Sequence, residues 1–119
     1  MIGQTTNPTG TDRTQTLCDI LSERLRQEVK FPEQHLPNVQ TPYQPRFVAG
    51  AMAARQWVDS SAQHGRLSWT DVLVEEVAEA IDEAEAGRVD ALRVELIQVA
   101  AVCVRWVEDI DRADREPVA

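Results

Sequence analysis

Apolar residues recur at spacings of three and four residues along four stretches of the chain, and this periodicity restricts the fold more than any other feature. Such spacing places apolar side chains on one face of an α-helix, whereas a half-buried strand needs strict alternation. Helices are therefore predicted over residues 14–30, 45–64, 68–86 and 90–112. We expect an all-α, four-helix bundle-like fold without strands.

The chain length of 119 residues suits a single domain, which we place at residues 14–113. Residues 1–13 are rich in threonine and glycine and are predicted to form a flexible tail, as are residues 114–119. Four prolines, Pro32, Pro37, Pro42 and Pro45, interrupt regular structure after the first helix, and Pro45 can serve in the first turn of the second. Phe47 begins the apolar face of that second helix.

Twelve basic and twenty acidic residues give a formal net charge of -8. This balance argues against a general nucleic-acid binder or a protein of anionic membrane surfaces. Cys18 and Cys103 lie far apart and outside any zinc or redox motif, and no apolar run reaches the length of a membrane span. A cytoplasmic location is therefore expected.

The third helix has a clear start and end in the sequence. Ser68 with Asp71 three residues later resembles a capping box, and Gly87 suits the C-terminal stop. Between them lie Glu76 and Glu79, which border the apolar face, and three further acids that we interpret mainly as a solvated face: Glu75, Asp82 and Glu83.

The fourth helix contains the most informative pair. Within its apolar segment 94–104 only Glu95 and Gln98 are polar, and their spacing puts them on one side of the helix. A carboxylate buried there would need a cation, a proton or a metal. One interpretation is an ion pair with Arg55 or Arg105, or a polar layer that fixes the register of the bundle.

The other interpretation is a metal site. The short connection at Gly87 makes the third and fourth helices antiparallel neighbours, so that Glu76 and Glu79 can face Glu95 and Gln98. Carboxylate and amide oxygens are hard ligands of the kind that Mg²⁺ prefers, and Mn²⁺ could take its place.

Residues 69–104 resemble the signature of the all-α nucleotide pyrophosphohydrolases, which include MazG-like proteins, among them compact phage-type ones, and dimeric dUTPases. In that signature E-E-x-x-E is followed by a spacer and then by E-x-x-D. Glu75, Glu76 and Glu79 match the first half, and Glu95 matches the glutamate of the second. Gln98 stands where the family pattern has an aspartate. Residues 23–37 resemble the N-terminal part of the phage-type proteins more loosely.

The resemblance implies a MazG-type fold and a Mg²⁺-dependent hydrolase that converts a nucleoside triphosphate into a monophosphate and pyrophosphate. It implies Glu76, Glu79 and Glu95, with Gln98, as metal ligands. Glu75 and Glu76 are then the catalytic candidates, with Glu75 able to orient the attacking water.

Residues that could bind the nucleotide are fewer and carry weaker signals. Trp57, His64 and Trp69 flank the carboxylate helix in sequence, and an aromatic ring can stack on a base, although ordinary packing, or a loop position for His64, is the better explanation of each. Lys30 and Arg93 could contact phosphates. Trp106 is interpreted as a core residue.

Two other classes of function fit the sequence. A nucleotide-binding or sequestering protein with little turnover agrees with Gln98, and a helical adaptor would use its polar layer only to set register. In each case the apolar segment 94–104 predicts a homo-oligomer, with a dimer as the minimum unit and a tetramer as the larger form, and with Trp57 or Trp106 at the interface.

Overall fold

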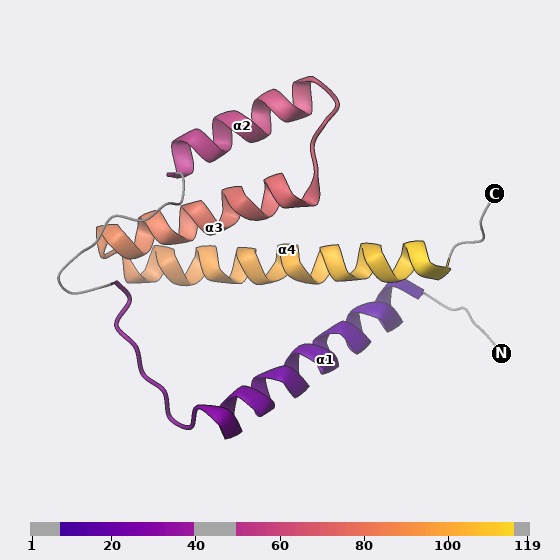
Figure 1. Ribbon diagram of the computed structural model, residues 1–119, viewed down its shortest axis with the longest axis vertical. Coiled ribbons are helices and arrows are strands. Elements are labelled where there is room, and N and C mark those ends of the chain that lie inside the picture. The colour runs from indigo at the N-terminus through magenta and orange to yellow at the C-terminus, as the bar shows by residue number, and fades with distance from the viewer. Residues whose placement is uncertain (1–7, 40–49, 116–119) are drawn as a thin grey trace. The chain divides into compact units, whose positions relative to one another are not determined.

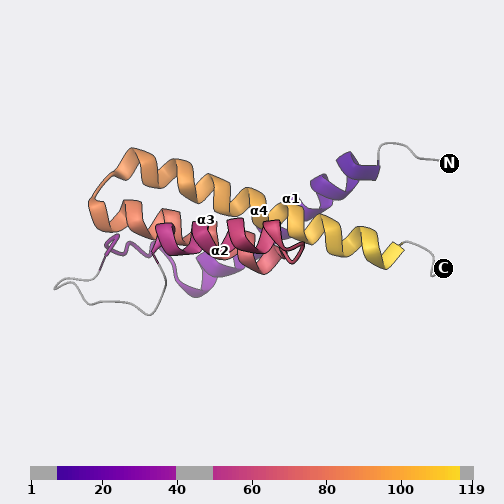
Figure 2. The same ribbon diagram turned by 90° about the horizontal axis from the view of Figure 1, so that it is seen from above.

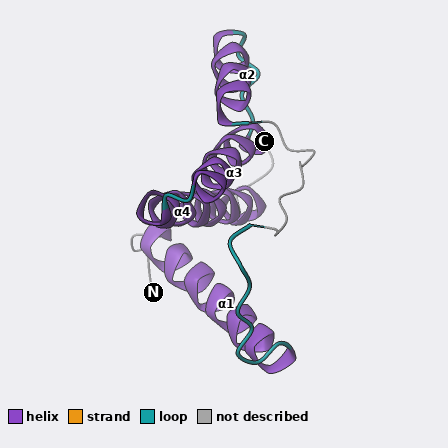
Figure 3. Cartoon of the chain, turned by 90° about the vertical axis from the view of Figure 1, so that its left-hand side faces the viewer, coloured by secondary structure: helices purple, strands orange, loops and turns teal. Residues whose placement is uncertain are grey.

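The computed structural model describes residues 8–39 and 50–115, and in these ranges the chain is helical without a strand (Figures 1 and 3). Its elements are α1 (Pro8–Lys30), α2 (Ala51–Gln63), α3 (Trp69–Ala86) and α4 (Val89–Arg115). The prediction of an all-α chain is confirmed. The predictions for Pro42, Pro45 and Phe47 concern positions outside the described ranges.

The terminal helices are longer than the sequence predicts. Helix α1 begins at Pro8 instead of Thr14, and α4 continues to Arg115. Proline is well suited to the first turn of a helix, because the amide hydrogen it lacks would have no partner there. Residues 8–13 and 114–115 are thus helical in the structure, although the sequence predicts that they lie in the two tails.

Contacts divide the chain into two compact units, and each is described here by itself. One comprises residues 1–35 and 104–119, and the other comprises residues 36–103. Helix α4 contributes its first part, residues 89–103, to the second unit and its remainder to the first.

The unit formed by residues 36–103 is built on close packing between α2 and α3. Its buried apolar side chains are small: Ala54 of α2 and Ala78 and Ala80 of α3. Small side chains let helix axes approach closely, so that longer polar side chains beside them can reach across. The α2–α3 contact is therefore a narrow apolar seam with polar contacts along its margin.

Local signals fix both ends of α3. Ser68 accepts a hydrogen bond from the Asp71 amide, and the Asp71 carboxylate accepts one from the Ser68 amide, which completes the predicted capping box. At the other end Gly87 adopts φ 74° and ψ 18°, the left-handed conformation that glycine tolerates best. These two signals determine which residues of α3 lie on each face.

The turn at Gly87 reverses the chain into α4, so that α3 and residues 89–103 run side by side in opposite directions (Figures 1 and 2). Helix α3 covers only one side of this part of α4. Val94, Leu96 and Ile97 remain 53%, 51% and 57% exposed within one chain. The segment that the sequence predicts to be central is thus half covered.

In the unit formed by residues 1–35 and 104–119, α1 contacts the C-terminal part of α4. Arg13 Nε donates to Glu108 Oε2 at 2.9 Å, and Thr16 is buried. The apolar face of α1 is largely exposed, as shown by Leu17, Leu21 and Leu25. None of the helices in the described ranges is long and apolar enough to cross a membrane.

Candidate metal centre

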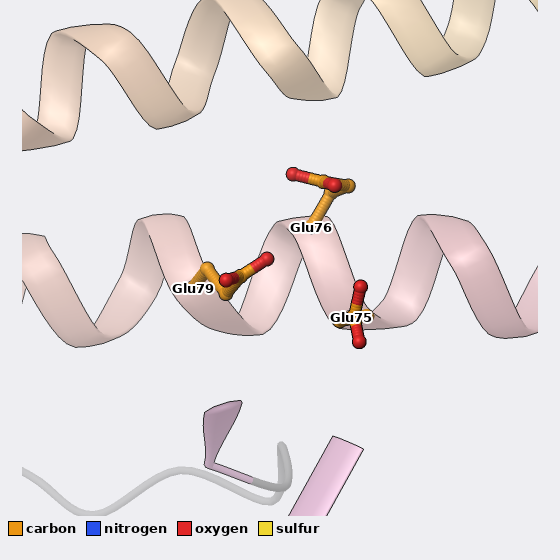
Figure 4. Close-up of side chains that lie close together, drawn as sticks. All are labelled: Glu75, Glu76 and Glu79. Carbon is orange, nitrogen blue, oxygen red and sulfur yellow. The ribbon is translucent and has the colours of Figure 1, made fainter. Parts of the chain in front are cut away.

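Three glutamates of α3 form a compact group of ligand oxygens. One carboxylate oxygen from each of Glu75, Glu76 and Glu79 lies within 4.8 Å of the other two. Figure 4 shows Glu76 extending toward α4, Glu75 at the opposite edge of α3, and Glu79 lying across the helix between them. All three side chains are half-buried. The expectation of a solvated face does not describe Glu75, which belongs to this cluster.

Helix α4 adds the predicted second pair to the cluster. With its amide nitrogen turned toward the carboxylates, Gln98 donates to Glu76 Oε2 at 3.2 Å and to Glu95 Oε2 at 3.1 Å. One amide group therefore joins carboxylates from both helices of the hairpin. Glu95 is half-buried and Gln98 is exposed, so the pair lies at the margin of the hairpin. Gln98 therefore connects the two predicted polar pairs, but Glu95 is not one of the carboxylates that lie within 4.8 Å of one another.

The electrostatic environment opposes full ionisation of the cluster. Burial, followed by the nearby Glu79 carboxylate, raises the pKa of Glu75 and of Glu76 above the ordinary glutamate value. The pKa of Glu95 is raised by the same two causes in the same order. Like charges held this close raise the free energy of the ionised state, so a bound cation would stabilise the arrangement.

A cation from α2 already contacts the cluster. Arg55 Nη2 donates to Glu79 Oε2 at 2.9 Å, and this ion pair raises the pKa of Arg55. The positive charge of Arg55 also attracts the carboxylates of Glu75 and Glu95, although less strongly than burial disfavours their ionised forms. Arg55 was predicted as a partner of Glu95, but its hydrogen bond goes to a glutamate of α3.

A second contact between α2 and α3 involves an acid that the sequence places on the solvated face. The Ala51 amide at the start of α2 donates to Asp82 Oδ2 at 2.9 Å, in a partly buried position. An acid at a helix N-terminus satisfies a free amide hydrogen and interacts favourably with the helix dipole. Asp82 therefore holds α2 against α3 instead of facing solvent alone.

The aromatic candidates are distributed unevenly around the cluster. The Trp57 ring is 65% exposed, and its Nε1 donates to Asp71 Oδ1 at 2.8 Å, one helical turn before Glu75. His64 lies at the C-terminal end of α2, where its Nδ1 is 2.7 Å from the Ser60 carbonyl oxygen. Trp69 is the first residue of α3 and is half-buried. Trp57 is therefore the exposed aromatic ring closest in register to the carboxylates.

Arg93 is not brought to the cluster, and Lys30 belongs to the other unit. Arg93 precedes Glu95 by two residues on α4, a spacing that puts it on the other side of that helix. Lys30 ends α1 in the other unit, where its Nζ lies 5.3 Å from the centre of the Phe31 ring. Arg55, which the sequence does not single out as a functional residue, contacts the cluster instead.

Comparison with known proteins returns no match to this chain, either among family models or among curated proteins and solved structures.

The donor set nevertheless fits a hard divalent cation. Three carboxylates of α3 converge, and an amide group joins one of them to a fourth carboxylate on α4. These groups supply the oxygen ligands that Mg²⁺ and Mn²⁺ prefer. An incoming cation would have to turn the Gln98 amide over to use its oxygen, because the hydrogen bonds to Glu76 and Glu95 engage its nitrogen. Gln98 is exposed, so this rotation meets no packed neighbour.

Proposed function

We propose that this chain is a Mg²⁺-dependent nucleoside triphosphate pyrophosphohydrolase of the MazG-like kind, which releases pyrophosphate and a nucleoside monophosphate. The observation that carries the proposal is the group formed by Glu75, Glu76 and Glu79 of α3, with Glu95 of α4 joined to Glu76 through the Gln98 amide. The order of these residues along the chain resembles the signature of that family. An acidic protein needs a cation to bind a polyphosphate, and the cluster is where a cation would bind.

The cluster supplies two chemical roles. When bound, Mg²⁺ neutralises phosphate charge and lowers the pKa of a coordinated water. Glu76 and Glu79 of α3 are the ligands that would hold it together with Glu95 of α4, which the Gln98 amide joins to Glu76. Glu75 lies at the far edge of α3 and has a raised pKa, which favours proton transfer to this carboxylate and suits a general base (Figure 4).

The nucleoside end of the substrate would lie toward α2. Trp57 presents an exposed ring that hydrogen-bonds Asp71, one helical turn before Glu75, and base–aromatic stacking is tolerant of base identity. We assign base stacking to Trp57 ahead of His64 and Trp69. Arg93 is left without a role in phosphate binding, and Lys30 stays a candidate for that role.

The proposal includes assembly into a homodimer or a tetramer. Val94, Leu96 and Ile97 are more than half exposed on one chain, and exposed apolar side chains in a contiguous stretch of helix favour association. The exposure of Trp57 is equally compatible with a place at that interface.

Specific observations favour the two alternatives. Sequestration without turnover is favoured by Gln98, whose amide nitrogen faces the carboxylates where a fourth acid would complete the signature. An adaptor is favoured by the exposed apolar faces of α1 and α4.

A panel of nucleoside and deoxynucleoside triphosphates, incubated with and without Mg²⁺, separates these functions. The proposed function predicts Mg²⁺-dependent pyrophosphate release that Glu79→Gln abolishes. Glu85→Gln, which removes the same charge from an exposed position of α3, should retain it. Tight binding with intact nucleotide recovered would indicate sequestration, and neither binding nor release would indicate an adaptor.

A further inference from the structure

Arg55 contacts a carboxylate that a bound cation would also need. Its Nη2 hydrogen-bonds Glu79 Oε2 at 2.9 Å, and Glu79 is one of the three carboxylates of the α3 cluster (Figure 4). The guanidinium also attracts Glu75 and Glu95. In the metal-free protein, this side chain therefore supplies positive charge to carboxylates that repel one another.

Simultaneous contact of a guanidinium and a divalent cation with this carboxylate is unfavourable. The hydrogen bond from Arg55 engages Glu79 Oε2 and leaves Oε1 free, so Arg55 and a metal ion would compete for this carboxylate through their charges. Two cations a few ångströms apart also repel each other. Binding of a cation by Glu79 and release of Arg55 are therefore linked.

Arg55 can leave without separating α2 from α3. The Trp57–Asp71 and Ala51–Asp82 hydrogen bonds connect the same two helices on either side of it. The Arg55 side chain is 54% exposed, so it can turn into solvent where its charge is hydrated. Displacement thus requires a change of rotamer and no change of fold.

We propose that Arg55 is a built-in competitor of the divalent cation, which pairs with Glu79 in the metal-free protein and is displaced when the cation binds. This inference rests on the proposed function, because it takes the carboxylate cluster to be a cation site. Its consequence is that the metal-free cluster is balanced by an internal positive charge, and the cation affinity is set partly by the strength of one ion pair.

The test is Mn²⁺ binding to the full chain, measured by calorimetry without nucleotide. Arg55→Gln should lower the Kd for Mn²⁺ about tenfold, since both the competing ion pair and the repulsion are lost. Arg55→Met, which keeps the apolar stem of the side chain, should do the same. Arg55→Lys keeps the charge and should stay within about threefold of the parent.

Arg88→Gln is the matched control. Arg88 Nε pairs with Glu83 Oε1 at 2.6 Å at the end of the same hairpin, so this variant also removes one positive charge and one ion pair from α3. Its Kd for Mn²⁺ should remain near that of the parent. An equal decrease in Kd for Arg88→Gln and Arg55→Gln would mean that only net charge matters, which would overturn the proposal.

A second measurement uses the unmodified protein. In an NMR titration with Mg²⁺, the Arg55 Nε–Hε signal should shift as the ion pair opens, while the Arg88 signal stays in place. An unchanged Arg55 signal at saturating Mg²⁺ would overturn the proposal even if a neutral variant failed to fold.

Failure of this inference differs from failure of the proposed function. If Glu95→Gln abolishes Mn²⁺ binding but Arg55→Gln binds Mn²⁺ with the Kd of the parent, the competitor role is wrong and the metal site stands. If neither the parent nor Arg55→Gln binds Mn²⁺, both are wrong. If Mn²⁺ binds as described but no nucleotide is hydrolysed, the competitor role stands and the hydrolase is refuted.

Discussion

The change of Glu95 to glutamine separates a metal ligand from a structural polar residue, because it keeps the shape of the side chain and removes its charge. Glu95 shares the Gln98 amide with Glu76, and burial and nearby carboxylates raise its pKa. As a metal ligand it should be required for stabilisation by Mg²⁺. As a purely structural residue it should leave any such stabilisation unchanged.

The expected magnitudes can be worked out for both states. Two unit charges about 5 Å apart repel by about 0.8 kcal/mol in water, and roughly half of this remains at physiological salt. Glu95→Gln should therefore leave the metal-free protein as stable as the parent or more stable by about 0.4 kcal/mol. Mg²⁺ at about 100 times its Kd stabilises the parent by about 2.7 kcal/mol, or about 10 °C in Tm for a chain of this size.

The assay is thermal unfolding followed by circular dichroism with and without Mg²⁺, at one fixed protein concentration because association also affects Tm. Glu95→Gln should lose nearly all of the Mg²⁺-dependent increase. Glu85→Gln, an exposed glutamate of α3, should keep it. An equal increase in Glu95→Gln and the parent would refute the assignment of Glu95 as a ligand.

Three further predictions follow from the same structure. Gln98→Asp removes the hydrogen bonds to two carboxylates and adds a like charge, so it should lower the stability of the metal-free protein. The same variant should raise the affinity for Mg²⁺ and the rate of any hydrolysis. A loss of metal binding would show that the amide is a required donor. Hydrogen bonds from Trp57 and Ser68 lower the pKa of Asp71 in the folded protein. The stability that Asp71 contributes is therefore present above its unfolded-state pKa and is lost as the pH falls through the lower folded-state pKa. Acid titrations should show a smaller loss of stability in Asp71→Asn than in the parent, and equal losses would contradict this role. Sedimentation at micromolar concentration should give a mass of two or more chains, and an Ile97→Glu variant should shift it toward one; a fully active single chain would refute the predicted assembly.

Local signals explain which parts of the fold were predictable. The capping box at Ser68 and the left-handed Gly87 act within a few residues, so the ends of α3 follow from the sequence. The facing pairs on α3 and α4 follow as well, because a short turn leaves two consecutive helices little choice but to lie antiparallel. The early start of α1 at Pro8 was missed because glycine and threonine nearby favour a loop on composition alone.

Contacts between α2 and the hairpin were not predictable in the same way. Arg55 pairs with Glu79 and not Glu95, and Asp82 accepts a hydrogen bond from the first turn of α2. Both depend on how far α2 slides and rotates along α3, and helical periodicity does not specify either quantity. The same reason explains the exposed residues of α4, since a pattern shows which side chains need cover but not which chain provides it.

The alanines between α2 and α3 have a consequence for how this chain can vary. Ala54 and Ala78 carry no chemistry, yet they set the separation across which Arg55 reaches Glu79. A valine or leucine at Ala78 would leave every charged residue intact and still move α2 away from the carboxylates. A substitution at one of these alanines can therefore break the contact between Arg55 and the carboxylate cluster while Arg55 and the glutamates stay unchanged. Tolerance to substitution in this unit should be lowest where the side chains are smallest.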